Sequence, residues 1–401
     1  MKVTLADRME LIKPSVIRMY AEKALAPGMI TFANGNPSPA TFPVAEMERF
    51  YAEAFKEDNL NSLMLYGTAV GYAPLIQALK DRLQSLYGFD FDKNDLSIVS
   101  GGTQAVDIAS KILLNKGDGV IVEEPSYSSC YNIFHAYEAE LIGVPMNDDG
   151  MDTGLLEEAL RTHSNVKFIY TITSFHNPTG FTTGRDKREQ ILKLAQKYDV
   201  MVVEDDPYAE LRFAGEAMAP VKSLDTEGRV LYTGSLSKVI APGFRLGFLV
   251  ADKQLSQAIM VSKQVTDIHC NSLAQYVAWK ILTETDYESH IRKAQQEYLR
   301  KSSLISETLR KYMHPACRLS DPEGGMFIMM FLPDNISAED FVWKGIDRGV
   351  VCVPGSGFTI DGKEPTHSVR LCYATVSDEL IVKGAKILGE VSREMIEGET
   401  A

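Results

Sequence analysis

The chain has 401 residues but no long apolar run. No uninterrupted apolar stretch approaches the roughly 20 residues that a membrane-spanning helix needs. The first turns carry Lys2, Asp7, Arg8, Glu10 and Lys13, so they lack the apolar core of a signal peptide. We therefore expect a protein that is neither inserted into a membrane nor exported.

Cysteine is scarce and scattered. The five cysteines are Cys130, Cys270, Cys317, Cys352 and Cys372. Their number is odd, and they form neither a Cys-x-x-Cys pair nor a metal-ligand spacing. The pattern disfavours a disulfide framework and a metal site, and it favours the reducing cytoplasm as the location.

Basic residues are fewer than acidic ones: the sequence has 41 Lys and Arg residues and 54 Asp and Glu residues, which gives a net charge of −13. No run of basic residues reverses this balance, so binding to nucleic acid or to an anionic membrane is disfavoured. No Walker pattern occurs, and Gly117-Asp118-Gly119 precedes its strand and lacks a third glycine, which disfavours a nucleotide enzyme. An anionic ligand must therefore be held by a local group of donors.

What the sequence does contain is an alternation of β-branched runs with amphipathic segments from about residue 95 to 250. This alternation predicts an α/β fold with a mostly parallel central sheet. We expect strands at residues 97–99, 120–122, 168–172, 200–203, 230–232 and 247–250. Because 401 residues exceed what one hydrophobic core usually supports, we also expect two domains.

A long helix is expected at residues 286–313, where apolar residues recur at helical spacing. It would lead into a smaller α+β domain with short strands near residues 324–328, 351–355 and 370–373. Residues 14–23 look helical and are expected to pack with this second domain. The predicted organisation is an amino-terminal segment 1–45, a large domain 46–285 and a small domain 286–401.

One lysine follows a predicted strand together with two hydroxyls and a guanidinium: Ser235, Ser237, Lys238 and Arg245. A lysine amine can condense with an aldehyde carbon to form a Schiff base. Serine hydroxyls and the planar Arg fork suit a phosphate dianion. The combination predicts that Lys238 binds a phosphorylated aldehyde, and pyridoxal phosphate is the candidate cofactor. No metal is predicted.

Further polar residues follow the other predicted strands. Gly102, Thr103 and Gln104 open a helical run, so their backbone N–H groups would point at a phosphate; an ordinary glycine turn is the alternative. Tyr127 and Asn177 also lie just beyond strands, where α/β sheets bind their ligands. These segments are therefore expected to meet in one cleft.

Asp205 precedes Tyr208 by three residues, so both can meet one aromatic heterocycle from the same turn. A carboxylate beside a pyridine nitrogen keeps that nitrogen protonated, which lets the ring accept electrons. We predict Asp205 at the ring nitrogen, with Tyr208 and Asn177 hydrogen-bonded to the ring's phenolic oxygen. The neighbouring Asp206 is the alternative carboxylate, and a solvated turn before Pro207 is the alternative for both.

Tyr127 and Arg370 complete the predicted site. Tyr127 can stack on the cofactor ring, with a buried core tyrosine as the alternative. Arg370 can pair through two hydrogen bonds with a substrate carboxylate, with a surface salt bridge as the alternative.

These segments stand in the order that is typical of class I aminotransferases. The motifs are Ser-Gly-Gly-Thr-Gln-Ala at 100–105, Ser-Phe-His-Asn-Pro-Thr-Gly at 174–180, Val-Glu-Asp-Asp-Pro-Tyr at 203–208, Ser-Leu-Ser-Lys at 235–238 and Ser-Val-Arg-Leu at 368–371. The chain resembles this family from about residue 30 to about residue 375. It is most similar to the subgroup of 2-aminoadipate and aromatic aminotransferases. The resemblance implies the fold-type I architecture, pyridoxal 5'-phosphate and a homodimer with shared active sites.

The resemblance also assigns residues that the patterns alone do not. Tyr66 is similar to the family tyrosine that reaches across the dimer interface to the neighbouring phosphate, and Gly35 resembles the glycine beside the substrate. In the subgroup an amino-terminal helix lines the substrate pocket; here this helix would carry Arg18, a candidate partner for an acidic substrate side chain. His176 stands where the subgroup commonly has glutamine, and it is either near the substrate or a plain loop residue.

The implied function is an aminotransferase that moves the amino group of an L-amino acid to a 2-oxo acid such as 2-oxoglutarate. The implied donors are glutamate or 2-aminoadipate, aromatic and large aliphatic amino acids. Lys238 would hold the cofactor and shuttle a proton. A lyase or decarboxylase remains an alternative, because the cofactor stabilises a carbanion whichever bond breaks. An amino-acid or cofactor sensor is less favoured, since we find no basic DNA-binding segment, and so is an inactive binding module.

Overall fold

The central element of the computed structural model, which describes residues 3–362 and 366–398, is an eight-stranded sheet of order β2-β9-β8-β7-β6-β3-β4-β5. The strands from β8 through β7, β6 and β3 to β4 pair in parallel. Pairing is antiparallel at β2–β9, β9–β8 and β4–β5. The bounds are β2 Asn94–Val99, β3 Gly119–Glu124, β4 Glu140–Asn147, β5 Gly150–Met151, β6 Val166–Thr171, β7 Met201–Asp205, β8 Val230–Ser235 and β9 Gly247–Asp252. The predicted α/β fold with a mostly parallel sheet is confirmed.

Helices cover both faces of this sheet, because its central strands bury side chains on both sides. In β3, Val120 and Val122 pack into one apolar cluster, whereas Ile121 packs into the cluster on the other face. Nearly continuous apolar strands are expected of such doubly covered parallel strands. The covering helices are α5 Gly102–Leu113, α6 Ser128–Ala136 and α10 Ser256–Thr266 on one face, and α7 Thr153–Thr162, α8 Arg185–Lys197 and α9 Val221–Leu224 on the other.

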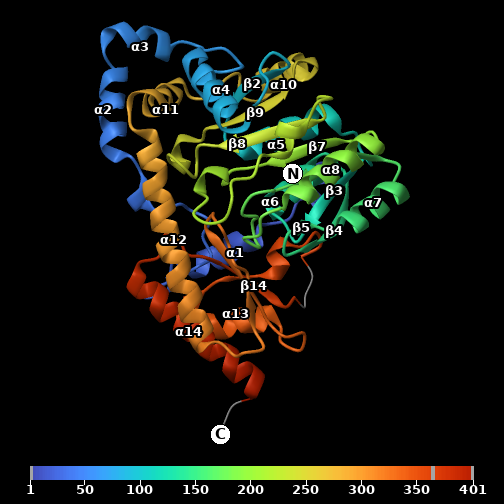
Figure 1. Cartoon of the computed structure of the whole chain (residues 1–401), viewed down its shortest axis with the longest axis vertical. Coiled ribbons are helices and arrows are strands. Elements are labelled where there is room, and N and C mark those ends of the chain that lie inside the picture. The colour runs from blue at the N-terminus through green and yellow to red at the C-terminus, as the bar shows by residue number, and fades with distance from the viewer. Residues whose placement is uncertain (1–2, 363–365, 399–401) are drawn as a thin grey trace.

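A smaller antiparallel sheet has the order β10-β11-β14-β13. Its strands are β10 Arg318–Leu319, β11 Phe327–Phe331, β14 Ser368–Cys372 and β13 Val353–Pro354, with helices α13 Ala338–Asp347 and α14 Asp378–Glu397 beside them. Helix α12, Tyr287–Tyr312, packs against α14 and runs alongside both sheets (Figure 1). Its apolar stripe, including Ile291, Tyr298 and Ile305, is buried. Helix α12 therefore extends from the large sheet to the small one.

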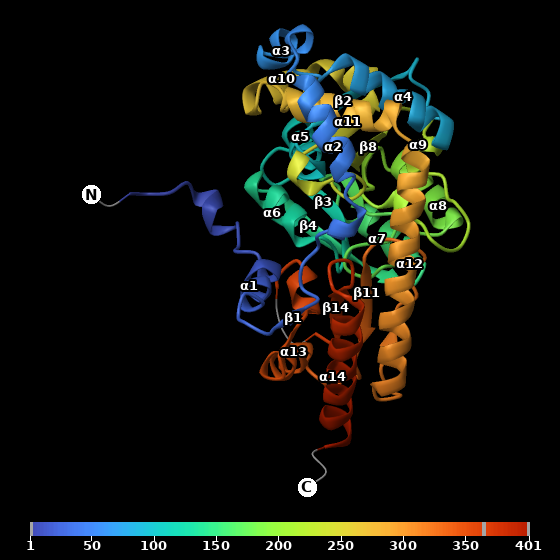
Figure 2. The same cartoon turned by 90° about the vertical axis from the view of Figure 1, so that its left-hand side faces the viewer.

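The amino-terminal segment has contacts with α6 beside the large sheet and with β13 of the small sheet. Figure 2 shows its first long helix beside α13. Helix α1, Val16–Lys23, begins after Ser15, whose side chain accepts a hydrogen bond from Arg18 N. Strand β1, Ile30–Thr31, pairs in parallel with β12, Val350–Val351. The next helices, α2 Val44–Ala54, α3 Glu57–Met64 and α4 Ala73–Tyr87, pack with α11 Ser272–Glu284 near the large sheet.

Short 3-10 helices fill several connections: η1 Asp7–Glu10, η2 Pro39–Thr41, η3 Ala209–Leu211, η4 Pro242–Phe244, η5 Lys253–Leu255 and η6 Gly355–Phe358. Within the described residues, no helix is both long enough and apolar enough to cross a membrane.

The predicted elements agree closely with the structure. Each strand predicted between residues 95 and 250 is present, and the helix predicted at 286–313 spans 287–312. The sequence patterns missed β4, because Gly143 and Pro145 interrupt its apolar alternation. The domain boundaries after residues 45 and 285 stay predictions.

Candidate active site

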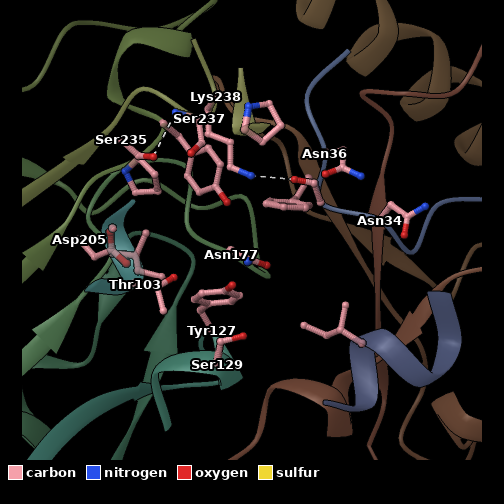
Figure 3. A pocket seen from close by; sticks show the side chains of 18 of the residues that line it. Asn34, Asn36, Thr103, Tyr127, Ser129, Asn177, Asp205, Ser235, Ser237 and Lys238 are labelled. Carbon is pink, nitrogen blue, oxygen red and sulfur yellow. Dashed lines mark hydrogen bonds between the residues drawn. The ribbon is translucent and has the colours of Figure 1, made fainter. Parts of the chain in front are cut away.

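A cavity of about 470 Å³ opens at the carboxyl-terminal edge of the parallel strands, between the large and the small sheet. Figure 3 shows Lys238 reaching into it opposite Tyr127, with Asp205 and Thr103 on one side and Asn34 and Asn36 on the other. The predicted site residues that line it are Arg18, Gly35, Gly102, Thr103, Tyr127, Asn177, Asp205, Tyr208, Ser235, Ser237, Lys238, Arg245 and Arg370. The structure therefore brings together residues that are far apart in sequence.

One end of the cavity is built to receive an anion. Helix α5 begins there without a side-chain cap on its first N–H groups, and such a terminus attracts negative charge. The guanidinium of Arg245 closes on this terminus and donates to Ser100 O at 3.2 Å. Gly101 has a φ of 80°, and a Cβ at this position would lie 2.6 Å from the Arg245 guanidinium nitrogen. Together with Ser235 and Ser237, these groups form a cradle for a phosphate.

Arg245 itself has a left-handed backbone, with a φ of 50°. A non-glycine residue in this region carries strain that the surrounding structure must hold in place. Here the turn after η4 directs the guanidinium toward the start of α5. The strained turn thus delivers the one cationic side chain of the cradle.

The amine of Lys238 lies in the middle of the cavity, where Nζ donates to Gly35 O at 2.8 Å. The Tyr208 ring centroid is 5.9 Å from Nζ. Burial lowers the pKa of Lys238 to about 8, and the positive charges of Arg370 and Arg245 act in the same direction. With this pKa, roughly a tenth of the amine is neutral near pH 7 and can act as a nucleophile or base.

Asp205 faces the cavity from the end of β7. Its Oδ2 accepts a hydrogen bond from the Tyr170 hydroxyl at 2.8 Å. Burial raises the pKa of Asp205 to about 6, while the hydrogen bond from Tyr170 acts in the opposite direction. Asp206 points away from the cavity and accepts from the Tyr232 hydroxyl at 3.3 Å. The geometry therefore favours Asp205 over the alternative carboxylate.

The small sheet supplies a guanidinium from β14. Arg370 donates from Nη1 to Asn177 Oδ1 at 2.9 Å and from Nη2 to Ala33 O at 2.5 Å. Its guanidinium carbon lies 4.7 Å from the ring centroids of both Phe327 and Phe358. Arg370 Nε is buried and has no hydrogen-bond partner among the described residues. A donor at this position suits a carboxylate that enters the cavity.

Two predicted residues do not line the cavity. Gln104 lies behind the loop, where its Oε1 accepts from Ser100 N at 2.6 Å and its Nε2 donates to Asp267 at 2.9 Å. Both ends of the Gln104 side-chain amide are therefore used inside the protein. Its predicted contact with the cofactor stays a prediction. Tyr66 is 86% exposed and lies outside the cavity, with its ring beside His269. The contact of Tyr66 with a second chain stays a prediction.

His176 belongs to a buried cluster beneath the site. Its Nε2 lies 3.2 Å from Glu123 Oε2 and 3.3 Å from Ser126 Oγ, and both Glu123 and His176 are almost fully buried. His176 is thus not a solvent-exposed loop residue. It links the loop before Tyr127 to the loop that carries Asn177.

The sequence analysis missed Glu123 and Tyr170 as members of the site's support. A signal for Glu123 is its place, with Glu124, at the end of an otherwise apolar strand. Tyr170 is a polar aromatic residue in the β6 run, one strand away from Asp205. Buried polar groups of this kind normally have specific partners, so each of them pointed to a hydrogen bond inside the fold.

Comparisons with known proteins agree with this arrangement. The family described as aminotransferase class I and II matches residues 28–388 of the chain. Over 387 residues the chain is 35% identical to aromatic-amino-acid aminotransferase 1 of Thermococcus litoralis, an alignment that covers 96% of this chain and 92% of the relative.

Two solved structures are similar over nearly their whole length. Kynurenine aminotransferase from Pyrococcus horikoshii, in complex with PMP, has a TM-score of 0.93 at 35% identity and covers 97% of each chain. Alpha-aminoadipate aminotransferase from Thermus thermophilus, complexed with N-(5'-phosphopyridoxyl)-L-leucine, has a TM-score of 0.89 at 30% identity and covers 98% of each chain.

The two neighbouring carboxylates give a direct test of the site. Asp205→Asn keeps the size of the side chain and removes a charge that faces the cavity, so turnover should fall about a hundredfold, or about 3 kcal/mol. Asp206→Asn should slow turnover only severalfold, because that carboxyl points away from the cavity. Steady-state kinetics of both variants decide the matter, and the reverse order of effects would contradict the assignment of Asp205.

Proposed function

This chain belongs to the aminotransferase class I and II family and is a pyridoxal-phosphate-dependent aminotransferase, and we propose that it transfers amino groups between L-amino acids and 2-oxo acids such as 2-oxoglutarate. The proposed donors are glutamate or 2-aminoadipate, aromatic and large aliphatic amino acids. One observation carries the proposal: the cavity has an anion cradle at one end, Arg370 at the other and the Lys238 amine between them. A lyase or a decarboxylase would use the same cavity, so the choice of transamination is supported by the matched family and relatives.

The residues of the cavity fit pyridoxal phosphate. When bound, this cofactor supplies an aldehyde that holds amino groups and a ring that accepts electrons from the substrate carbon. Gly102, Thr103, Ser235, Ser237 and Arg245 would hold the phosphate at the start of α5. An anion there is favoured by hydrogen bonds and by the helix dipole.

The aromatic ring would lie between Tyr127 and the strand ends. Asp205 would hold a proton on the pyridine nitrogen, since an adjacent carboxylate stabilises the cation. Tyr208 and Asn177 would donate hydrogen bonds to the phenolic oxygen. Asn177 Oδ1 is occupied by Arg370, so its amide nitrogen is the end that is available to donate.

Lys238 has two proposed tasks. Its neutral amine would hold the cofactor, and once displaced by substrate it would take the proton from the substrate Cα and return it to the cofactor side of the bond. A pKa of about 8 for Lys238 suits both directions of this transfer. Because Nζ already points into the cavity, no large rearrangement of the side chain is required.

Arg370 would bind the α-carboxylate of the substrate beside Gly35 and Asn177. Every amino acid and oxo acid carries this group, so Arg370 would serve both half-reactions. The rings of Phe327 and Phe358 hold its guanidinium plane in place. The contact stabilises substrate by about 2 kcal/mol as a charge-assisted pair.

The substrate side chain would extend toward α1. Arg18 lines this wall, with 83% of its side chain exposed, and its Nε lies 3.5 Å from Glu22. An exposed Arg on a surface helix can turn toward an acidic group or away from an apolar one. Ile17 and Ala21 line the same wall and can contact apolar side chains.

We also propose a homodimer in the cytoplasm. Exposed apolar side chains gather near Tyr66: Leu65, Val265 and Ile268 are all at least half exposed, and His269 joins the two segments through its contact with Tyr66. Exposed apolar patches of this kind mark interaction surfaces, and a second copy is the proposed partner. The free cysteines fit the proposed reducing compartment.

The reaction is tested with the purified protein, glutamate and a panel of 2-oxo acids. We expect oxo-acid formation from the donor together with a yellow protein, and loss of turnover in Lys238→Ala. Borohydride reduction followed by peptide mapping should label Lys238. Label on Lys263 or any other lysine would contradict the assignment.

Side-chain selection is tested through Arg18. Arg18→Ala should raise KM about fivefold for glutamate and 2-aminoadipate, as expected for an exposed ion pair, and leave leucine within about twofold. Glu22→Ala is the control, because it removes the partner of Arg18 and leaves the guanidinium in place. An equal rise in KM for acidic and apolar donors would show that Arg18 does not select the substrate by its side chain.

The dimer is tested by mass in solution. The wild-type protein should be a dimer at assay concentration, and Val265→Glu should shift it toward an inactive monomer because a charge is buried at the interface. Val382→Glu, at an exposed valine of α14, is the matched control and should remain dimeric. A fully active wild-type monomer would overturn the proposal of shared sites.

A further inference from the structure

Behind the phosphate cradle, a partly buried network of polar side chains connects α10 to the loop that opens α5. Gln104 accepts from Ser100 N at 2.6 Å and donates to Asp267 Oδ2 at 2.9 Å. Asp267 also accepts from Lys263 Nζ, at 2.8 Å to Oδ1 and 3.0 Å to Oδ2. The network of hydrogen bonds therefore extends from Lys263 through Asp267 and Gln104 to the backbone N–H of Ser100.

Burying the ammonium group of Lys263 costs hydration free energy. Its side chain is fully buried in the large sheet's helix layer, although ammonium groups lose much hydration energy on burial. All of its contacts are inside the protein: Asp267, Gln104 Oε1 at 3.4 Å and Cys270 Sγ at 3.2 Å. Apolar replacements of buried ion pairs are often neutral or stabilising, so stability alone does not account for this pair.

The polar network binds the backbone N–H of Ser100, and Arg245 of the cradle binds its backbone carbonyl. Ser100 N–H donates to Gln104, whereas Ser100 O accepts from Arg245 at 3.2 Å. Gly101 follows with a φ of 80°, and α5 starts at the next residue. Fixing the two peptide groups that flank the Ser100 Cα therefore sets the direction of the first free N–H groups of α5.

The same segment reaches the surface that we assign to the dimer. Ile268, directly after Asp267, has a φ of 63°, which is strained for a β-branched residue. The ring of His269 contacts Tyr66, with ring centroids 6.0 Å apart. The segment thus touches both the polar network and the neighbourhood of Tyr66.

We propose that Lys263, Asp267 and Gln104 are positioning residues that shape the cradle for the cofactor phosphate from behind. The inference rests on the proposed function only in taking this cradle as the phosphate site. None of the three side chains lines the cavity. They fix the backbone of Ser100 and thereby the start of α5. Removing them is expected to weaken the binding of ligands that carry a phosphate, and not of ligands that lack one.

The test compares two ligands of the apoenzyme, pyridoxal phosphate and pyridoxal, which differ by the phosphate. Gln104→Leu and Lys263→Met should each raise the dissociation constant for pyridoxal phosphate roughly tenfold, the lower end of what supporting contacts contribute at bound-ion sites. The dissociation constant for pyridoxal should stay within about twofold. Gln104→Leu leaves the Lys263–Asp267 ion pair intact, so it provides the measurement even if Lys263→Met does not fold.

The matched control is Lys222→Met. Lys222 is also a buried lysine in an ion pair, with Asp225 at 3.1 Å, but this pair lies at the opposite end of β8, where Asp225 binds Val230 N. This variant should lose stability without losing the preference for the phosphorylated ligand. An equal loss of preference in Lys222→Met would show a general effect of destabilisation and overturn the inference.

Arg245→Ala distinguishes a failure of the positioning role from a failure of the assigned phosphate site. If it abolishes the preference for pyridoxal phosphate while Gln104→Leu and Lys263→Met keep it, the cradle stands and the positioning role is overturned. If Arg245→Ala also keeps the preference, the assigned phosphate site is wrong, and the inference fails with it.

Discussion

The convergence of parallel strands at one edge of a sheet is the constraint on which this site depends. In parallel pairing, β3, β6, β7 and β8 all end on the same side, so the residues that follow them meet in space. Tyr127, Asn177, Asp205 and Ser235 come from four such ends. The doubly buried sheet keeps these ends rigid, and the polar residues need no other common feature in the sequence.

Burial then gives the converged groups their chemistry. It raises the pKa of Asp205 to about 6 and lowers the pKa of Lys238 to about 8, although each stands in a chain of net charge −13. A proton can therefore be held or released by either group near neutrality, and the local environment rather than the overall charge decides which form is present.

The sequence was informative where function depends on strand ends, and uninformative where it depends on contacts between distant segments. Lys238 and its neighbours were predictable because a strand places the residues that follow it. The sequence does not show which of Asp205 and Asp206 faces the cavity. Successive side chains of a strand point to opposite faces of the sheet, and the sequence does not say which face each one takes. The side-chain partner of Gln104 could not be predicted, because Asp267 is 163 positions away and follows the end of another helix, α10.

Helix α1 gives the cavity a wall that is largely independent of the protein's stability. Tyr20 is its single buried residue among those described, and Val16 and Ile17 pack partly against the core. Arg18 and Met19 are exposed, and substitutions at such positions usually change stability by less than about 0.5 kcal/mol. The residues that we propose to hold the cofactor, in contrast, follow the ends of the buried strands. Selection can thus alter the substrates of such an enzyme through a handful of nearly neutral changes in one short helix, without passing through unfolded or cofactor-free intermediates.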